Sequence, residues 1–435
     1  MRYSANTPST QKAMLDAIGV TSIDDLLSTV PEEVRTEGPL DIAGPWAEAD
    51  LRARLEDLKS TQPRHAFVGA GLYDHYIPTP VESLAGRSEW VTSYTPYQAE
   101  LAQGTLTMYY EFQTYIACLT GQEIANSGMY DGSTALAEAV LMAMRVQPKA
   151  DPVVYVSKAV HPHYLAVLRT YMRFVGVEIV TLDIDKTTGR TIISDQSEEM
   201  SKSVAVVLQS PNFMGVVEDT KAIPDDAFKI GVCTEALAMA ITRPLDVDIM
   251  VGECQSFGIP IQLGGPTAGF FATRKKWVRK MPGRLVGRTV DSNGDEAFCI
   301  TLATREQFIR REKATSNICT SSGLMCLRAT IYLSLLGGAG LEELARKNAA
   351  TARFFVDGLA RLGVQRVHSE PYFNELALDF SACPDLIDTL LAKNIVMGLP
   401  LSDFFEGCEH HYLCAFTETS YSRAAAILEE ISSHA

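Results

Sequence analysis

The stretch YDGSTALAEAVLMAM, residues 130–144, holds the feature that decides the fold. Gly132, Ser133 and Thr134 stand at the start of an alanine-rich pattern, which we expect to form a helix over residues 133–144. Free backbone N–H groups at a helix start, two hydroxyl groups and the helix dipole together can bind a phosphate group. The alternative is that Ser133 or Thr134 only caps the helix, because both residue types are common N-caps.

The segments that follow alternate between apolar strand patterns and helical patterns. This alternation is typical of an α/β protein whose largely parallel sheet is covered on both faces. After about Ser321 a helical pattern leads into a smaller α+β part, which ends in YLCAFTETS (412–420) and a final amphipathic helix. The expected strands are 153–157, 177–182, 203–210, 228–233, 248–253 and 269–273, with a helix from His163.

Two polar residues follow expected strands at the carboxyl edge of the sheet, where open α/β sheets bind ligands. His161 comes after the strand 153–157, and its ring can stack on an aromatic cofactor; the alternative is a hydrogen-bonded structural histidine or a cap. Glu235 ends the segment KIGVCTE and adds a carboxylate. A phosphate-binding helix start, a histidine and an acid in this order indicate the pyridoxal-phosphate enzymes of the aspartate-aminotransferase fold.

Such an enzyme carries a lysine that binds the cofactor through its amine. The stretch where that lysine belongs is GECQSFGIPIQLGGPTAGFFATRKKW, residues 252–277, and it contains no lysine before Lys275. Lys275 and Lys276 follow the expected strand 269–273 and so lie at its far end. The sequence therefore predicts the fold of a pyridoxal-phosphate enzyme without its lysine.

The N-terminal side of the chain is predicted to be helical. Helical patterns between Thr10 and Gln62 include a cap at Ser22 and a face formed by Leu51, Leu55 and Leu58. After a loop rich in Gly, Tyr and Pro, a long helix is expected to begin at Pro96 with Thr95 as its cap.

We expect three domains and a cytoplasmic protein. The domains are an N-terminal helical arm (1–62), a large α/β domain (63–325) and a small C-terminal α+β domain (326–435). The net charge of -15 argues against a nucleic-acid partner. No segment is expected to approach the roughly 20 apolar residues of a membrane span. The nine cysteines contain no Cys-x-x-Cys pair, so reduced thiols are expected.

Long blocks of the sequence closely resemble the P-protein of the glycine cleavage system, an oxidoreductase that decarboxylates glycine. The resemblance runs from residue 9 to residue 420, and it implies the pyridoxal-phosphate-dependent transferase fold, fold type I. The length and the missing lysine are similar to the alpha chains (subunit 1) of the split form of this family. The blocks are TSYTPYQAELAQGTL (92–106), LTGQEIANSGMYDGSTALAEA (119–139), GGPTAGFFA (264–272), MPGRLVGRTVD (281–291) and TREQFIRREKATSNICTS (304–321).

The resemblance also implies what this chain has lost. The cofactor lysine of the family aligns with Gln255, or with Ser256 if a gap is placed differently, and neither side chain can form a Schiff base. The aspartate that pairs with the pyridinium nitrogen is replaced by Glu235, whose extra methylene shifts the carboxylate. Gly132, Ser133, Thr134 and His161 persist as remnants of a cofactor site.

By resemblance, a beta subunit (subunit 2) carries the pyridoxal phosphate covalently, and this chain does not. The implied complex binds glycine through that cofactor, releases carbon dioxide and transfers the aminomethyl group to the lipoyl group of H-protein, in functional association with T-protein and L-protein. Two alternatives are a stand-alone pyridoxal-phosphate lyase or aminotransferase, and a non-catalytic scaffold subunit.

Residues of this chain can line the active site of the beta subunit, since the resemblance implies a site between the two chains. The candidates are Tyr94, Thr95 and Tyr97 beside an expected helix start, with Asn317 and Thr320 as further candidates. The alternative for the tyrosines is packing in the subunit interface.

Two further patterns are open to a functional and a structural interpretation. The segment RKKWVRKMPGRLVGR (274–288) contains no acid and can dock an acidic partner such as H-protein, or it can form internal ion pairs. The segment CEHHYLC (408–414) superficially resembles a metal site, but adjacent histidines on a strand point to opposite faces. We therefore expect no metal.

Overall fold

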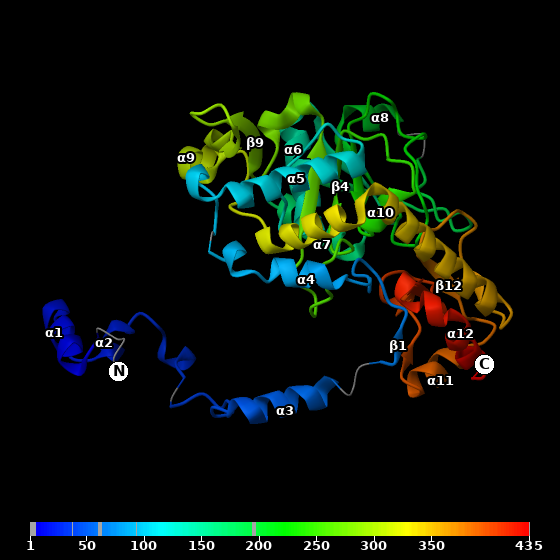
Figure 1. Cartoon of the computed structure of the whole chain (residues 1–435), viewed down its shortest axis with the longest axis horizontal. Coiled ribbons are helices and arrows are strands. Elements are labelled where there is room, and N and C mark those ends of the chain that lie inside the picture. Colours follow the sequence, from blue (N-terminus) through cyan, green and yellow to red (C-terminus); the bar gives the residue numbers. More distant parts are fainter. Residues whose placement is uncertain (1–5, 37, 60–62, 93, 194–196, 435) are drawn as a thin grey trace. The chain divides into compact units, whose positions relative to one another are not determined.

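The computed structural model describes residues 6–36, 38–59, 63–92, 94–193 and 197–434. The chain divides into two compact units, residues 1–62 and residues 63–435, and each is described by itself. Figure 1 shows their helices and strands with the labels used below.

The first unit consists of short helices: α1 (Pro8–Ile18), α2 (Ile23–Leu26) and α3 (Glu48–Lys59). Ser22 caps α2 as predicted, because its hydroxyl accepts the N–H of Asp25 while the Asp25 carboxylate accepts the N–H of Ser22. None of the described residues in these helices is buried, and the predicted apolar face of α3 is exposed.

A seven-stranded sheet forms the centre of the second unit. Its strand order is β2-β8-β7-β6-β5-β3-β4, and the strands from β7 to β4 are mutually parallel. Only β8 and the short β2 run antiparallel to their neighbours. All six predicted strands are confirmed, whereas β2 was not predicted. The bounds are β2 Ile124–Ala125, β3 Asp151–Ser157, β4 Glu178–Leu182, β5 Ser203–Gln209, β6 Lys229–Cys233, β7 Ile249–Glu253 and β8 Gly269–Thr273.

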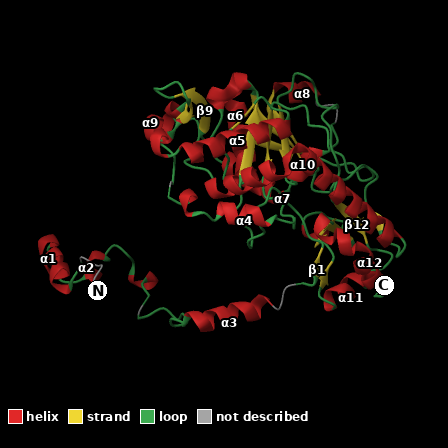
Figure 2. Ribbon diagram, in the orientation of Figure 1, coloured by secondary structure: helices red, strands yellow, loops and turns green. Residues whose placement is uncertain are grey.

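Helices cover both faces of this sheet, as predicted (Figure 2). On one face, α6 (Gly132–Val146) and α7 (Pro162–Met172) pack against side chains of β3, β5, β6 and β7. On the other face, α5 (Gln103–Thr120) and α10 (Gly323–Ala360) pack against β6, β7 and β8, while α8 (Ser197–Lys202) packs against β3 and β5. Successive residues of each strand alternate between the two cores.

Helix α5 begins at Gln103, so the predicted start at Pro96 with Thr95 as the cap is wrong. Gln98 has extended backbone dihedral angles, and the Thr95 hydroxyl is buried without a hydrogen-bond partner. The side chain of Tyr97 accepts a hydrogen bond of 2.9 Å from Arg284. We infer that this tertiary contact outweighs the local capping pattern and keeps residues 96–98 out of the helix.

The C-terminal part has its own sheet, of strand order β11-β12-β15-β14. Strand β1 (His65–Ala66) pairs in parallel with β13 (Ile395–Val396), so the start of the second unit joins this part. Helix α10 runs across the predicted domain boundary at residue 325, and the division of this unit into two domains stays a prediction. The remaining elements are α4 Thr79–Ala85, β9 Leu285–Val290, β10 Glu296–Thr301, α9 Gln307–Arg310, β11 Gln365–Arg366, β12 Glu375–Asp379, α11 Leu386–Ala392, β14 Leu399–Pro400, β15 His411–Ala415 and α12 Ala424–Ser432.

Helix α10 is long and apolar enough to cross a membrane by length and composition alone. The expectation that no segment approaches such a span is therefore wrong for this helix. Its residues Cys326, Leu327 and Tyr332 are buried in the core that α5 shares. A core helix of a soluble protein passes the same test of length and hydropathy.

Candidate functional site

The predicted phosphate-binding residues lie at the start of α6, as expected. The carboxylate of Asp131 already accepts hydrogen bonds from two of them, Ser133 and Thr134. One carboxylate oxygen of Asp131 accepts the backbone N–H of Thr134 and the hydroxyl of Ser133, both at 2.7 Å. The hydroxyl of Thr134 donates to the same oxygen at 3.0 Å. The N-cap is Asp131, so the alternative that Ser133 or Thr134 caps the helix is wrong, and both hydroxyl groups instead donate to the cap residue.

A second carboxylate, that of Glu253 at the end of β7, lies at the same helix start. Its Oε2 accepts the N–H of Gly132 at 3.2 Å, and its Oε1 accepts the N–H of Cys254 at 2.9 Å and the hydroxyl of Thr267. Burial raises the pKa of Glu253 to about 7, and the charge of Asp131 adds to the effect. Two acidic groups thus stand where a phosphate anion would have to bind.

Residues 69–76 (GAGLYDHY), which we call the inner loop, contact the other predicted cofactor residues. The Nε2–H of His161 donates to the carbonyl of Ala70 at 2.8 Å, because its Nδ1 accepts the N–H of His163 at 3.1 Å. Burial lowers the pKa of His161 to about 4, which agrees with a neutral ring. A Cβ on Gly71 would lie 3.2 Å from Nε2 of this ring. The inner loop therefore lies directly against His161.

Gln255, one of the two residues predicted to match the family lysine, has an amide that is bonded to the inner loop. Its Oε1 accepts the N–H of Tyr73 at 2.7 Å, while its Nε2 donates to the carbonyls of Tyr73 and Ile259, both at 2.9 Å. The adjacent Ser256 is fully buried, and its hydroxyl has no hydrogen-bond partner. Neither side chain supplies an amine.

Glu235 follows β6, as predicted, and binds the ring of His75 from the inner loop. Nε2 of His75 lies 3.0 Å from Oε2 of Glu235, and Nδ1 lies 2.8 Å from Oε2 of Glu418. Burial alone would lower the pKa of His75, but the charges and hydrogen bonds of Glu235 and Glu418 raise it to about 10. His75 is therefore an imidazolium that bridges two buried carboxylates.

Glu375, at the start of β12, binds the inner loop from the C-terminal part. Its Oε1 accepts the N–H of Ala70 at 2.5 Å, and its Oε2 accepts the hydroxyl of Tyr73 at 2.9 Å. Burial, with a smaller contribution from the charge of Glu235, raises the pKa of Glu375 to about 7. This carboxyl group is largely protonated in slightly acidic solution.

These contacts decide whether the chain fits pyridoxal phosphate, the cofactor that the fold implies. The amine is replaced by the amide of Gln255, which is hydrogen-bonded, and two carboxylates already accept the N–H groups of Gly132 and Thr134. Nε2 of His161 and Oε2 of Glu235 are already bonded to the inner loop. The residues of this chain therefore do not fit pyridoxal phosphate.

The inner loop was predicted only as a loop, and the roles of His75, Tyr73 and Glu375 were not predicted. One signal was available in the sequence. Glu253 ends the apolar run DIMVGE, and Glu375 begins the run ELALD. An acid next to a buried strand needs a partner, which such a pattern can indicate but cannot identify.

The residues proposed to line a partner's site divide between two surface cavities. Tyr94, 83% exposed, and Thr320 line a cavity of about 480 Å³ beside the start of α10. Tyr97 lines another of about 580 Å³ with Phe308 and Cys319. Two of the predicted residues line neither: Thr95 and the exposed Asn317, which accepts a hydrogen bond from Gln307.

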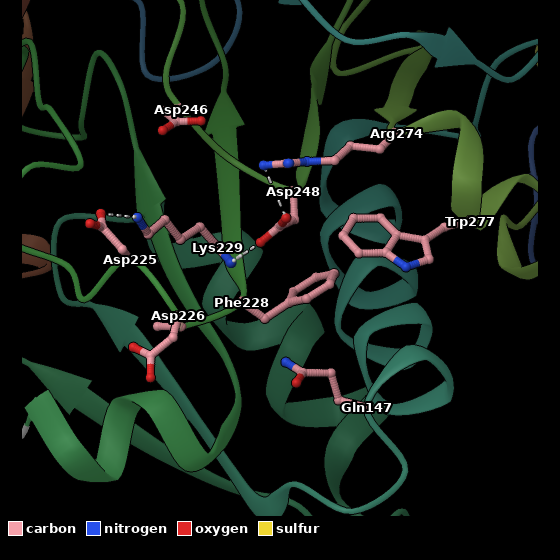
Figure 3. Close-up of a pocket in the computed structure, with 10 residues that line it drawn as sticks. Gln147, Asp225, Asp226, Phe228, Lys229, Asp246, Asp248, Arg274 and Trp277 are labelled. Atoms are coloured by element: carbon pink, nitrogen blue, oxygen red, sulfur yellow. Dashed lines mark hydrogen bonds and ion pairs between the residues drawn. The ribbon is translucent and has the colours of Figure 1, made fainter.

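A cavity of about 400 Å³ lies at the opposite edge of the sheet, near the start of β6 (Figure 3). Asp248 accepts the backbone N–H of Lys229 at 2.9 Å and pairs with Arg274 at 3.2 Å. The ammonium of Lys229 lies 3.9 Å from Asp225. The charged groups of this cavity therefore pair largely with one another, and none of the predicted cofactor residues lines it.

The basic segment 274–288 forms internal ion pairs in part. Arg274 pairs with Asp248, Arg284 with Glu306 and Arg288 with Glu296. Lys275 and Lys276 lie beyond β8 at the edge away from Gln255, as predicted, because β8 runs antiparallel to β7. Within the described ranges, no group of three or more His, Cys, Asp or Glu side chains is arranged to hold a metal ion.

Comparisons with known proteins identify the family of the chain. The family model described as glycine cleavage system P-protein matches residues 1–430. A relative from Anaeromyxobacter dehalogenans (strain 2CP-C), named probable glycine dehydrogenase (decarboxylating) subunit 1, is 44% identical over 432 residues, which are 96% of each chain.

Solved structures show the same fold. The crystal structure of a glycine decarboxylase (P-protein) in inhibitor-bound form is 38% identical, with a TM-score of 0.83 over 100% of both chains. The Lactobacillus brevis glutamate decarboxylase, 13% identical with a TM-score of 0.65, covers 92% of this chain and 95% of its own, and shares the fold alone. The predicted fold, type I of the pyridoxal-phosphate-dependent enzymes, is confirmed. From the match along nearly its whole length, the chain belongs to the glycine cleavage system P-protein family.

Proposed function

We propose that this chain is the non-lysine-bearing subunit of a two-subunit glycine decarboxylase in the glycine cleavage system. The observation that carries the proposal is that Gln255 and Ser256, which match the family lysine, offer no amine in a chain that the family model matches over residues 1–430. The amide of Gln255 makes three hydrogen bonds inside the protein, so this side chain is fixed in the packed interior. The name subunit 1 among the relatives supports a partner chain.

In this proposal the partner, subunit 2, holds pyridoxal phosphate covalently, and that cofactor supplies the electron sink for decarboxylation when bound. The assembled enzyme would take glycine, release carbon dioxide and transfer the aminomethyl group to the lipoyl group of H-protein, linked in function to T-protein and L-protein. We place the complex in the cytoplasm, which suits the nine free cysteines.

The part of this chain is to complete the partner's site and to exclude water from it. Tyr94 is the leading candidate, because its side chain is almost fully exposed and lines a cavity beside the first turn of α10. Tyr97 is held by Arg284 and by an edge contact with Phe308, so it can present a fixed surface. Thr95, between these two tyrosines, and Asn317 are further candidates for the same role.

Exchange of bicarbonate with the carboxyl group of glycine by the coexpressed pair tests this proposal. We expect Tyr94→Phe to lower the exchange rate about tenfold, which corresponds to about 1.4 kcal/mol, and Tyr97→Phe to lower it less. Tyr421→Phe is the matched control, since Tyr421 is also an exposed tyrosine but lies in the C-terminal part. If both Tyr94→Phe and Tyr97→Phe leave the rate unchanged, the chain is a scaffold without contact to the chemistry.

The chain purified without its partner tests the stand-alone alternative. A chain that held the cofactor by itself would show the visible absorbance of lysine-bound pyridoxal and would gain a borohydride-stable adduct on one lysine. We expect neither in the purified chain, because Gln255 and Ser256 have no amine.

A further inference from the structure

We propose that the inner loop, residues 69–76, together with Glu253, takes the place of pyridoxal phosphate inside this chain and keeps the cofactor out. This inference rests on the proposed function, in which the partner carries the cofactor. It adds that the exclusion is built from several parts of the chain and does not depend on the missing lysine alone.

His75 supplies the contact that a pyridinium nitrogen would make. A protonated ring nitrogen of the cofactor needs a carboxylate to accept its N–H, and Glu235 occupies that position. Here the imidazolium of His75, also a protonated aromatic nitrogen ring, donates to Glu235 at 3.0 Å. Its second nitrogen is fixed by Glu418 at 2.8 Å, so the ring is held at both ends.

Glu253 supplies an acceptor oxygen at the start of α6. The N–H of Gly132 points to its carboxylate at 3.2 Å, and backbone and hydroxyl groups of Cys254 and Thr267 hold the other oxygen. The space is also filled, because a Cβ on Gly132 would lie 2.1 Å from the hydroxyl of Tyr164. A phosphate group would have to displace both side chains.

The backbone of the inner loop fills the space between these two ends. Gly71, at φ +94°, lies against His161 in a conformation that favours glycine. The N–H and the carbonyl of Tyr73 both bond to Gln255, so the two peptide groups on either side of the Tyr73 α-carbon stand beside the lysine position. The inner loop therefore contacts His161 at the predicted ring-stacking position, Gln255 at the lysine position and Glu235, the acid that would pair with the pyridinium nitrogen.

Removal of the inner loop would leave several buried polar groups without partners. Glu375 would lose the N–H of Ala70 and the hydroxyl of Tyr73, while Glu418 would lose His75 and the N–H of Tyr76. Unpaired buried carboxylates are costly, so molecules with the loop displaced are rare. The apparent affinity for a ligand falls in proportion to the fraction of molecules that are open to it. A lysine at position 255 is therefore not sufficient to create a cofactor site.

Borohydride trapping on the full-length chain tests this inference. We compare Gln255→Lys alone with an open variant that carries Gln255→Lys, Tyr73→Ala and His75→Ala. Each is incubated with pyridoxal phosphate and reduced, and mass spectrometry measures the adduct at position 255. We expect at least about tenfold less adduct in the first variant. Gln255→Lys with Tyr76→Ala is the matched control, since the side chain of Tyr76 is 64% exposed, and it should behave like Gln255→Lys alone.

Equal labelling of Gln255→Lys and the open variant would overturn the inference, as would an open variant that is folded by circular dichroism and stays unlabelled. If the open variant does not fold, amide hydrogen exchange in the unaltered chain tests the inference instead. The amides of Ala70, Tyr73 and Tyr76, which donate to Glu375, Gln255 and Glu418, should exchange about a thousandfold more slowly than unprotected amides. Exchange at the rate of an exposed loop would refute the proposal.

These measurements use the isolated chain, so their failure is distinct from failure of the proposed function. A loop that exchanges quickly would leave the glycine exchange activity of the coexpressed pair unaffected. Conversely, if the coexpressed pair is inactive, the inner loop can still be protected from exchange and the Gln255→Lys variant can still stay unlabelled.

Discussion

Nε2 of His75 lies 3.0 Å from Oε2 of Glu235, and 3% of each side chain is exposed. Nδ1 of the same ring lies 2.8 Å from Glu418, so one buried imidazolium joins an acid that follows β6 to an acid that follows β15. A buried ion pair of this kind stabilises a protein little more than well-packed apolar side chains in the same place would. Removal of one partner alone is strongly destabilising, because it leaves the other charge buried and unpaired.

Replacement His75→Gln should lower the free energy of unfolding by about 3–5 kcal/mol, because it leaves Glu235 and Glu418 as buried charges without a counter-charge. Denaturant unfolding monitored by circular dichroism measures the change. His410→Gln is the matched control at an exposed histidine and should change stability by less than about 0.5 kcal/mol. An unchanged free energy of unfolding in His75→Gln would show that the two carboxylates need no counter-charge.

The stability difference between the wild type and His75→Gln should depend on pH. The pKa of His75 is raised from 6.5 to about 10 in the folded state, so its contribution is fully present below about pH 6.5 and is lost as pH rises through about 10. Unfolding midpoints measured from pH 6 to pH 10 should therefore converge. A constant difference over this range would mean that His75 is neutral in the folded protein.

Replacement Glu375→Gln should stabilise the protein at pH 8. The carboxyl pKa is raised to about 7, so folding favours the protonated form, and this contribution is present below about pH 4.5 and lost as pH rises to about 7. Glutamine keeps acceptor Oε1 for Ala70 and offers a donor to the oxygen of Tyr73. We expect a gain of about 1–3 kcal/mol at pH 8 and almost none at pH 4.5. The exposed Glu343→Gln is the control, and a loss of stability at pH 8 would contradict the assignment.

Charge reversal in the basic segment should weaken binding of H-protein if this segment docks it. The combined change Lys275→Glu, Lys276→Glu and Arg279→Glu should raise the KM of the coexpressed pair for lipoylated H-protein about three- to tenfold with little change in kcat. Added salt should raise the wild-type KM and affect the variant less. The exposed Lys149→Glu is the control, and an unchanged KM in the triple variant would place the docking surface elsewhere.

The seven-stranded sheet could be predicted from the sequence because its strands are short and almost wholly apolar, as in β5 (SVAVVLQ), and their ends coincide with polar residues. The positions of His161 and Glu235 followed from their places after these strands, whereas the start of α6 followed from its own alanine-rich pattern and Gln255 from the family resemblance. Such local patterns extend over fewer than about 20 residues.

The contacts of those residues could not be predicted, because they join parts of the chain far apart in sequence. Tyr73 meets Gln255 and Glu375 across 182 and 302 residues. The predicted start of α5 at Pro96 was wrong for the same reason, since Tyr97 bonds to Arg284 across 187 residues. A capping pattern reports only local preference, and a tertiary contact can override it.

The hydrogen bonds of Gln255 have a consequence for the history of such a chain. A single reversion to lysine would break the bonds of its amide to Tyr73 and Ile259, and it would place a buried amine where no cofactor can yet reach it. Such a change should therefore lower the folding stability of the chain without creating a cofactor site. On the proposed function, the folding stability of this chain would then hold the division of labour between the two subunits in place.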